Sequence, residues 1–466
     1  MWTHENAPSP TRTADDASDP AGTAPPGPAN PATPASPASP ANPPSPLAPP
    51  APPLLRNRSY MLLMSGLTTE SLGAGLALFA VPLVAYSLTG SVLQAGAVAA
   101  VGQVGALLAT LPAGVVADRV DRRRLIVAAS AVGASLWVTV GIAAALGSLT
   151  AWHLALVLFG ASVMGAFVDP ATSGAFRSVV PTPQLPTALA ATQGRDAVAS
   201  LLAGPVGGLL FAVGHAVPLV AAAIGSAATA LCTWAVREPL NGDTADARAT
   251  RPVEALRQGL RFVWSVPLFR TLLGLFVVIN VAFGGLLVGI NLELVRTGVT
   301  PVLIGVIDLA VGAGVLAGAV LAPRLVARVR AGALTVAALV TLAVGATLMA
   351  VAQTYPAYVA VLPLAVLLVP AVNAGLAGYA AAITPLEMQG RLASIMGLTG
   401  LTAGPLIPLV GAGLLDRFGI GTALVVLAGL LVVTVAAIAT ARPLRRVGTP
   451  DTWADDALPS GVGGAA

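Results

Sequence analysis

Residues 92–124 read VLQAGAVAAVGQVGALLATLPAGVVADRVDRRR and carry the clearest structural signal in the chain. Positions 92–117 contain no charged residue, and a helix of that length would cross the hydrocarbon core of a bilayer, about 30 Å thick. Residues 118–124 then supply two aspartates and four arginines. An uncharged helix that ends at a basic loop is typical of a membrane span whose end lies in the cytoplasm.

The composition of the whole chain agrees with this stretch. Of 466 residues, 56% are hydrophobic and only 9% are charged, whereas a soluble domain carries about 25% charged residues. All basic residues are arginines, in short clusters between apolar runs, and the net charge is only +4, which argues against a nucleic-acid partner. The phosphate-binding loop that cradles ATP requires a lysine, and this chain has none, so we do not expect direct use of ATP. The single Cys232 and the scattered histidines offer no metal site, so we expect no cofactor and no enzyme.

Windows of about 20 apolar residues predict twelve membrane helices, and we therefore expect an all-α membrane protein. Residues 1–54, rich in proline and alanine, are expected to form a disordered tail. The predicted spans are residues 60–87, 92–113, 125–146, 152–175, 187–213, 217–236, 271–292, 301–321, 332–352, 358–383, 392–415 and 420–440.

Arginines mark one side of this arrangement. If the amino terminus is inside, 21 arginines fall in inner segments, Arg296 and Arg417 fall outside, and Arg195 lies within a span. Because positive flanks are retained in the cytoplasm, both termini are expected there, with the chain in the cell membrane. The longest inner connection, residues 237–270, then separates bundles at 55–236 and 271–440. It contains an amphipathic segment that could lie on the membrane surface, and residues 441–466 form a second cytoplasmic tail.

The two halves of the sequence resemble each other. Their shared order of small and basic residues indicates a parallel duplication, which would place a substrate cavity between two pseudo-symmetric six-helix bundles. The corresponding positions are Gly96 and Gly305, Gly105 and Gly314, Arg119 and Arg328, and Gly204-Pro205 and Gly404-Pro405.

The loop after the second span, Gly114-Val115-Val116-Ala117-Asp118-Arg119-Val120-Asp121-Arg122-Arg123, resembles the G-x-L-A-D-R-x-G-R-R signature of the major facilitator superfamily. Asp121 replaces the usual glycine. Leu88-Thr89-Gly90-Ser91, the loop at Val180-Pro181, and Gly390-Arg391 are similar to the branch of drug, macrolide and siderophore exporters. The resemblance runs from about Leu55 to Arg446 and implies a secondary transporter.

This resemblance implies a gate at Gly114, Asp118, Arg119, Arg122 and Arg123. Asp118 would face the positive amino end of a neighbouring helix, while the arginines bridge cytoplasmic helix ends. The alternative is a positive-inside anchor, which gives no reason for Asp118.

The fifth span carries a segment similar to the antiporter motif G-P-x-x-G-G, at Gly204, Pro205 and Gly208. A proline removes one backbone donor, and glycines let helices approach closely, so we expect a bend and a tight seal. Plain helix packing is the competing account.

Four ionisable residues inside the spans are candidates for proton coupling or substrate binding, since a charge at membrane depth costs several kcal/mol unless it is paired or hydrated. Glu70, beside Thr68, Thr69 and Ser71, could exchange a proton, or could be held by those hydroxyls or by a neighbouring helix for structural reasons. Arg195 and Asp196 need not pair with each other, and Arg195 could hold Asp169 or attract an anion. Asp308 is either a second protonatable site or a water-exposed residue near the outer mouth.

The leading interpretation is proton-coupled export of a hydrophobic or amphipathic small molecule, a drug or secondary metabolite, by a monomer in the bilayer. Sparse polar residues in apolar spans suit such a substrate better than a sugar; they are Thr68, Glu70, Asn280, Asn291 and Asn373. The fourth span lacks the arginine that many proton-coupled exporters carry, which weakens the case for antiport. The alternatives are uptake or facilitated diffusion of a nutrient, and a non-transporting sensor or membrane enzyme.

Overall fold

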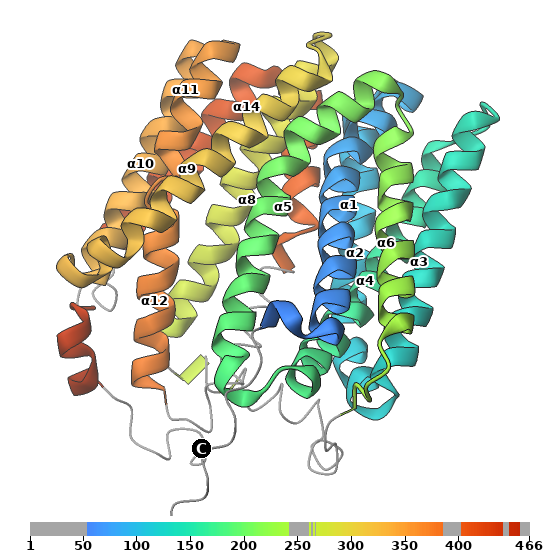
Figure 1. Cartoon of the computed structure of the whole chain (residues 1–466). Coiled ribbons are helices and arrows are strands. Elements are labelled where there is room, and N and C mark those ends of the chain that lie inside the picture. Colours follow the sequence, from blue (N-terminus) through green and yellow to red (C-terminus); the bar gives the residue numbers. More distant parts are fainter. Residues whose placement is uncertain are drawn as a thin grey trace, which may run out of the picture. The chain divides into compact units, whose positions relative to one another are not determined.

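The computed structural model describes residues 54–241, 261, 264–265, 267–384, 402–440 and 447–456, and these form helices without any strand. The predicted tail before residue 54, most of the 237–270 linker and Gly390-Arg391 lie outside the described residues. The helices, shown in Figure 1, are η1 Leu54–Arg56, α1 Arg58–Thr89, α2 Val92–Arg119, α3 Arg122–Ala145, α4 Ala151–Val179, η2 Thr182–Gln184, α5 Leu185–Val213, α6 Val217–Ala235, α8 Pro267–Arg296, α9 Pro301–Arg328, α10 Ala331–Ala352, α11 Tyr355–Val366, α12 Val369–Ile383, α14 Leu406–Thr440 and η4 Pro450–Asp456.

Side-chain caps fix where the first helices begin. Asn57, Ser91, Asp121 and Thr150 each accept a hydrogen bond from the backbone N–H three residues on, which satisfies an amide that has no partner within the helix. Gly90 ends α1 in a left-handed conformation (φ 65°), which glycine adopts without steric cost. Polar and glycine residues therefore confine the α1–α2 connection to two residues.

Two predicted spans differ in detail from the observed helices. The tenth is divided into α11 and α12, because Pro370 has no N–H to donate to Val366 and its ring crowds that carbonyl. Residues 392–401 of the eleventh span lie outside the described part, and its remainder begins α14. Within α14, Gly419 (φ 73°, ψ 170°) interrupts the helix between the predicted eleventh and twelfth spans.

The described helices are long and apolar enough to cross a membrane in eleven stretches, with α11 and α12 taken together and α14 taken as one. Residues 406–418 of α14 fall in the predicted eleventh span and the residues after Gly419 in the twelfth, so the helices are roughly consistent with twelve spans. Large apolar side chains also remain exposed on several helices, such as Leu231 (66%), Val344 (51%) and Val433 (64%). A surface of this kind is solvated by lipid tails. The chain is an all-helical, multi-pass membrane protein.

Helix packing in the second half repeats that of the first. α1 packs against α5 and α6, α2 against α4, and α3 against α4 and α6. In the second half, α8 packs against α14, α9 against α11 and α12, and α10 against α11 and α14. The halves meet where α5 contacts α9 and where α2 contacts α14, which gives two pseudo-symmetric bundles.

The glycines matched in the sequence occupy corresponding interfaces. A Cβ on Gly105 would lie 2.7 Å from the carbonyl oxygen of Phe159 on α4, and one on Gly314 would lie 2.5 Å from Cα of Pro363 on α11. Likewise, Gly96 faces Pro408 and Ala412 of α14, while Gly305 faces Gly204 of α5. The duplication read from the sequence therefore corresponds to duplicated packing.

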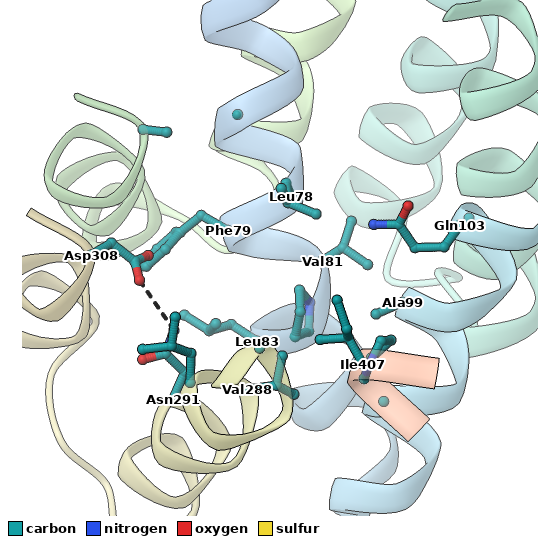
Figure 2. Close-up of a pocket in the computed structure, with 18 of the residues that line it drawn as sticks. Leu78, Phe79, Val81, Leu83, Ala99, Gln103, Val288, Asn291, Asp308 and Ile407 are labelled. Carbon is teal, nitrogen blue, oxygen red and sulfur yellow. Dashed lines mark hydrogen bonds between the residues drawn. The ribbon is translucent and has the colours of Figure 1, made fainter. Parts of the chain in front are cut away.

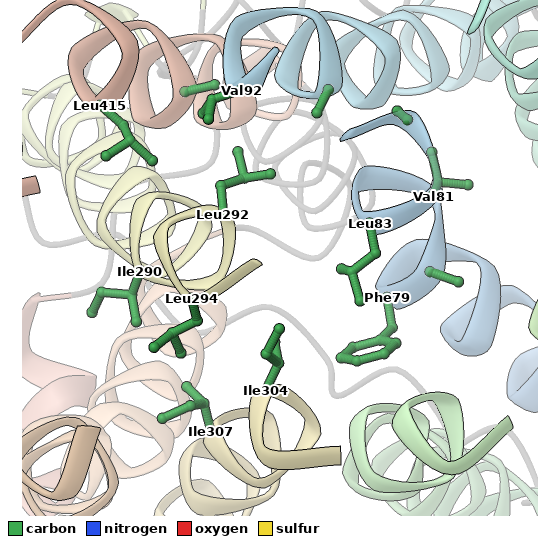
Figure 3. Packing of buried hydrophobic residues seen from close by; sticks show 14 of the residues in the cluster. Phe79, Val81, Leu83, Val92, Ile290, Leu292, Leu294, Ile304, Ile307 and Leu415 are labelled. Atoms are coloured by element: carbon green, nitrogen blue, oxygen red, sulfur yellow. The ribbon is translucent and has the colours of Figure 1, made fainter. Parts of the chain in front are cut away.

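Among the described residues, buried apolar side chains are shared between the halves at one end of the helices only. We call the end that carries the 118–124 loop the arginine-rich end, and the other the opposite end. The cluster at the opposite end joins both halves, and Figure 3 shows Phe79 and Leu83 of α1 facing Leu292 and Ile304 of the second half. At the arginine-rich end each half has separate clusters. The described bundles are therefore sealed together at the opposite end.

Part of the carboxyl-terminal tail packs on the second half. Trp453 of η4 lies edge-on to Tyr379 of α12, with ring centroids 5.9 Å apart. The first amides of α10, at Ala331 and Gly332, donate to the carbonyl oxygens of Gly448 and Val447. This segment thus covers the start of α10 and supplies acceptors to amides that the helix cannot satisfy itself.

Candidate functional site

A cavity of about 480 Å³ lies between the two halves, lined by α1, α2, α4, α5, α8, α9 and the start of α14. Its lining is mainly glycine and apolar side chains. In Figure 2 the Asp308–Asn291 pair lies on one side and Gln103 on the other, with Phe79, Leu83 and Val288 among the apolar side chains around them. The polar side chains in the lining are Gln103, Ser162, Ser200, Asn291 and Asp308.

A second pocket of about 360 Å³ lies within the first half. Glu70, Ser71, Asp169, Arg195 and Ser226 bring carboxyl, hydroxyl and guanidinium groups from α1, α4, α5 and α6 into it. The two pockets adjoin, because both are lined by Leu78, Leu158 and Ser162. The structure therefore places a charged pocket beside the large apolar cavity.

Glu70 has few partners in this second pocket. Ser226 Oγ of α6 donates to Glu70 Oε1 at 3.4 Å, and Glu70 Oε2 is buried without a hydrogen-bond partner among the described residues. The neighbouring hydroxyls do not hold the carboxyl: Thr68 and Thr69 donate to backbone carbonyls one turn back, and Ser71 donates to Asp196. The described contact to Glu70 therefore comes from a neighbouring helix, α6, and not from Thr68, Thr69 or Ser71, and a structural role for Glu70 stays open beside proton exchange.

Arg195 and Asp196, whose pairing the sequence left open, pair with each other. Arg195 Nη2 lies 2.7 Å and Nε 3.1 Å from Asp196 Oδ1. Although adjacent helical residues point about 100° apart, the long arginine side chain can bend to its neighbour. Ser71 Oγ donates to the same oxygen at 2.9 Å. No ion pair between Arg195 and Asp169 is found among the described residues, although both line the second pocket.

Asp308 lies at the junction of the two halves. It is partly buried, it lines the large cavity, and Asn291 Nδ2 of α8 donates to Asp308 Oδ1 at 3.3 Å. Asn291 Oδ1 is buried without a partner among the described residues.

The segment similar to the antiporter motif faces two helices. A Cβ on Gly204 would lie 2.6 Å from Asp308 Cβ, and one on Gly208 would lie 2.5 Å from the carbonyl oxygen of Pro301, both on α9. Gly207 instead faces the ring of Phe79 on α1, at 2.6 Å. Pro205 lies inside α5 without ending it. Gly204 and Gly208 allow the two halves to touch at the opposite end.

The loop that resembles the superfamily signature makes most of its described polar contacts with the segment after α6. Arg123 Nη2 donates to the carbonyl oxygen of Glu238 at 2.7 Å, and the backbone N–H of Arg122 donates to Asn241 Oδ1 at 2.9 Å. Asp118 and Arg119 are exposed, and Gly114 has open space beside it. The gate therefore stays a prediction.

Sequence reasoning missed part of the cavity lining. Gln103, Ser162 and Ser200 line the large cavity, whereas Thr68, Asn280 and Asn373 line neither pocket. A polar amide in an apolar span was the available signal for Gln103. Where the chain is described, no group of three acids, histidines or cysteines could hold a metal ion.

Comparison with known proteins agrees with this architecture. A curated relative, the multidrug efflux pump Tap of Mycolicibacterium fortuitum, is 28% identical over 383 residues, which cover 77% of this chain and 90% of the relative. Among solved structures, the nucleoside transporter NupG has a TM-score of 0.63 at 15% identity, covering 82% of this chain and 98% of NupG. A D-xylose-proton symporter has a TM-score of 0.60 at 15% identity, covering 84% and 99%.

The family model described as Major Facilitator Superfamily matches residues 63–400, which is well over half of the chain. The eleven membrane-length helical stretches of the described residues and the duplicated packing agree with this match, and together they indicate a transporter of small molecules, not an enzyme. The chain therefore belongs to the Major Facilitator Superfamily.

Proposed function

We propose that this transporter exports hydrophobic or amphipathic small molecules in exchange for protons. The observation that carries the proposal is the cavity between the halves, whose described lining is apolar apart from five polar side chains. A sugar or nucleoside needs dense hydrogen bonding, whereas an amphipathic compound gains most of its affinity from apolar contact. The similarity to a multidrug efflux pump supports the same substrate class.

The conformation suits loading from the cytoplasm. The halves share a core at the opposite end and have separate cores at the arginine-rich end. If arginine-rich loops lie in the cytoplasm, this is the inward-facing state of an alternating-access cycle. Release would require the shared core at the opposite end to separate while the arginine-rich ends come together.

In this proposal Glu70 carries the coupling proton. Arg195 is engaged by Asp196, so no described ion pair holds the Glu70 carboxyl in its charged form. A carboxyl that lies among hydroxyl groups and has no ion-pair partner among the described residues can lose and regain a proton when water reaches it. Both pockets are lined by Leu78, Leu158 and Ser162. Through these residues, substrate bound in the large cavity and the protonation of Glu70 in the second pocket would influence each other.

Transport by the purified chain in proteoliposomes tests this function. An antiporter should accumulate ethidium, a permanent cation, when the lumen is acidic, because protons leave as the dye enters. Accumulation of uridine or xylose driven by an acidic exterior would instead favour nutrient uptake. Protein-free liposomes with the same gradient give the background.

A further inference from the structure

The contact between α5 and α9 forms a narrow seam at the opposite end, made by Gly204, Gly208, Pro301, Gly305 and Asp308. A Cβ on Gly204 would lie 2.9 Å from the carbonyl oxygen of Gly305, so the two backbones nearly touch. The carboxyl of Asp308 is part of this seam, since its Oδ2 would lie 3.1 Å from the same Cβ. Closing the opposite end therefore brings an acid against the backbone of the other half.

The seam offers Asp308 no positive partner. The hydrogen bond described for its carboxyl comes from the neutral amide of Asn291, and no described salt bridge includes it. On α5, Arg195 lies nine residues before Gly204, about 14 Å along the helix, and is paired with Asp196. On α8, Arg296 is paired with Glu293 at 2.7 Å.

The remaining basic residues on α9 and on the helices that contact it lie far from Asp308 along those helices. Arg270 of α8 is at the arginine-rich end, as are Arg324 and Arg328 of α9 itself and Arg330 before α10. α11 and α12 carry no charged residue. No described cation is therefore placed to stabilise an ionised Asp308 while the seam is closed.

The pseudo-symmetric seam lacks this acid. α2 meets α14 around Gly96, where a Cβ would lie 2.8 Å from the carbonyl oxygen of Pro408. The shift of 209 residues that pairs Gly96 with Gly305 also pairs Ala99, which lines the same cavity, with Asp308. One seam thus closes through glycine and apolar contacts alone, so packing by itself does not require an acid in the other.

We propose that Asp308 links protons to the closure of the opposite end: the seam closes around the protonated acid and separates when the proton leaves. An isolated carboxylate at membrane depth is costly, whereas a neutral acid with one amide donor is tolerated. Separation of α5 from α9 would let water hydrate the carboxylate and reach the buried Asn291 Oδ1. This inference rests on the proposed proton-coupled cycle and adds a second proton-linked residue that controls which end is open.

Spin–spin distances across the opposite end test the inference without any substrate. Labels at Ser148→Cys and Thr354→Cys, in a Cys232→Ser background, report on the two halves from exposed positions before α4 and α11. In the full chain in nanodiscs, the ratio of the populations with open and closed distances should rise with pH, by up to about tenfold per pH unit for one linked proton.

Asp308→Asn and Asp308→Ala, the latter matching Ala99, should stay closed from pH 5.5 to 8.5. Asp416→Asn, an exposed acid on α14, is the control and should respond like the parent.

Two results would overturn the inference: a parent whose distances do not change with pH, or an Asp308 variant that responds as the parent does. The first needs no variant, so a folding defect cannot hide it. A flat response in a parent that still performs pH-gradient-driven transport would reject the seam alone. A responsive seam in a chain without such transport would reject the proposed function alone.

Discussion

Asn241 Nδ2 donates to Asp121 Oδ2 at 2.8 Å, which ties the loop between α2 and α3 to the segment that leaves α6 for the second half. The other oxygen, Asp121 Oδ1, accepts from the backbone N–H of Arg124 and caps α3. The superfamily signature that this loop resembles has a glycine at this position, and a glycine side chain could form neither of these hydrogen bonds. The substituted residue therefore joins the predicted gate loop to the start of the linker between halves.

Asp121→Ala should lower the stability of the chain, because it removes both the cap and the bond to Asn241. Loss of an N-cap costs about 1 kcal/mol. Asp121→Asn keeps one oxygen for the cap and should fall between Ala and the parent. Thermal unfolding in detergent measures the effect, and an Ala variant that unfolds at the parental temperature would contradict both roles.

Gly208→Ala should loosen the closed opposite end, since its Cβ would lie 2.5 Å from the carbonyl oxygen of Pro301 and 2.9 Å from Cα of Val302. Overpacking of this kind costs about 1–3 kcal/mol. Gly194→Ala is the matched control on α5, because nothing lies within 4 Å of its Cβ. The rate at which a cysteine introduced at Ser91 reacts with a soluble maleimide reports the loosening; equal rates in both glycine variants would show that Gly208 does not hold the seal.

The side of the membrane on which each loop lies can be tested by labelling intact cells. In a Cys232→Ser background, cysteines at Ser91, Ser148 and Thr354 should react with an impermeant reagent, and cysteines at Asp121 and Thr182 should not. The expectation follows from the 21 arginines assigned to inner segments. Labelling of Asp121→Cys from outside would reverse the orientation.

The gate prediction concerns Asp118, which is exposed in this conformation. If it docks on a neighbouring helix end only when the arginine-rich ends come together, Asp118→Asn should slow transport severalfold while the protein remains inserted and abundant. Asp451→Asn, an exposed acid of η4, is the control for charge loss at the same end. Parental transport by Asp118→Asn would leave the loop as an anchor.

The fold could be predicted from sequence because it depends on long apolar runs and on where arginine is tolerated, both of which are local properties. The break at Pro370 follows from its missing N–H, but whether it divides a span depends on tertiary packing. The Arg195–Asp196 pair could not be predicted because side-chain bending is not encoded in helical spacing. Gln103, Ser162 and Ser200 were missed as a group because their convergence on one cavity is set by how the helices cross.

The proposed coupling of export to protons depends most on Glu70. Glutamine keeps the size of the side chain and most of its hydrogen bonding but cannot release a proton. A matched control is Glu293→Gln, because Glu293 pairs with Arg296 and lines neither pocket.

The decisive measurement is ethidium accumulation by proteoliposomes with an acidic lumen, together with equilibrium ethidium binding. For Glu70→Gln we predict loss of at least tenfold in gradient-driven accumulation with binding within about twofold of the parent, while Glu293→Gln behaves as the parent in both. Undiminished uphill accumulation by Glu70→Gln would contradict the account.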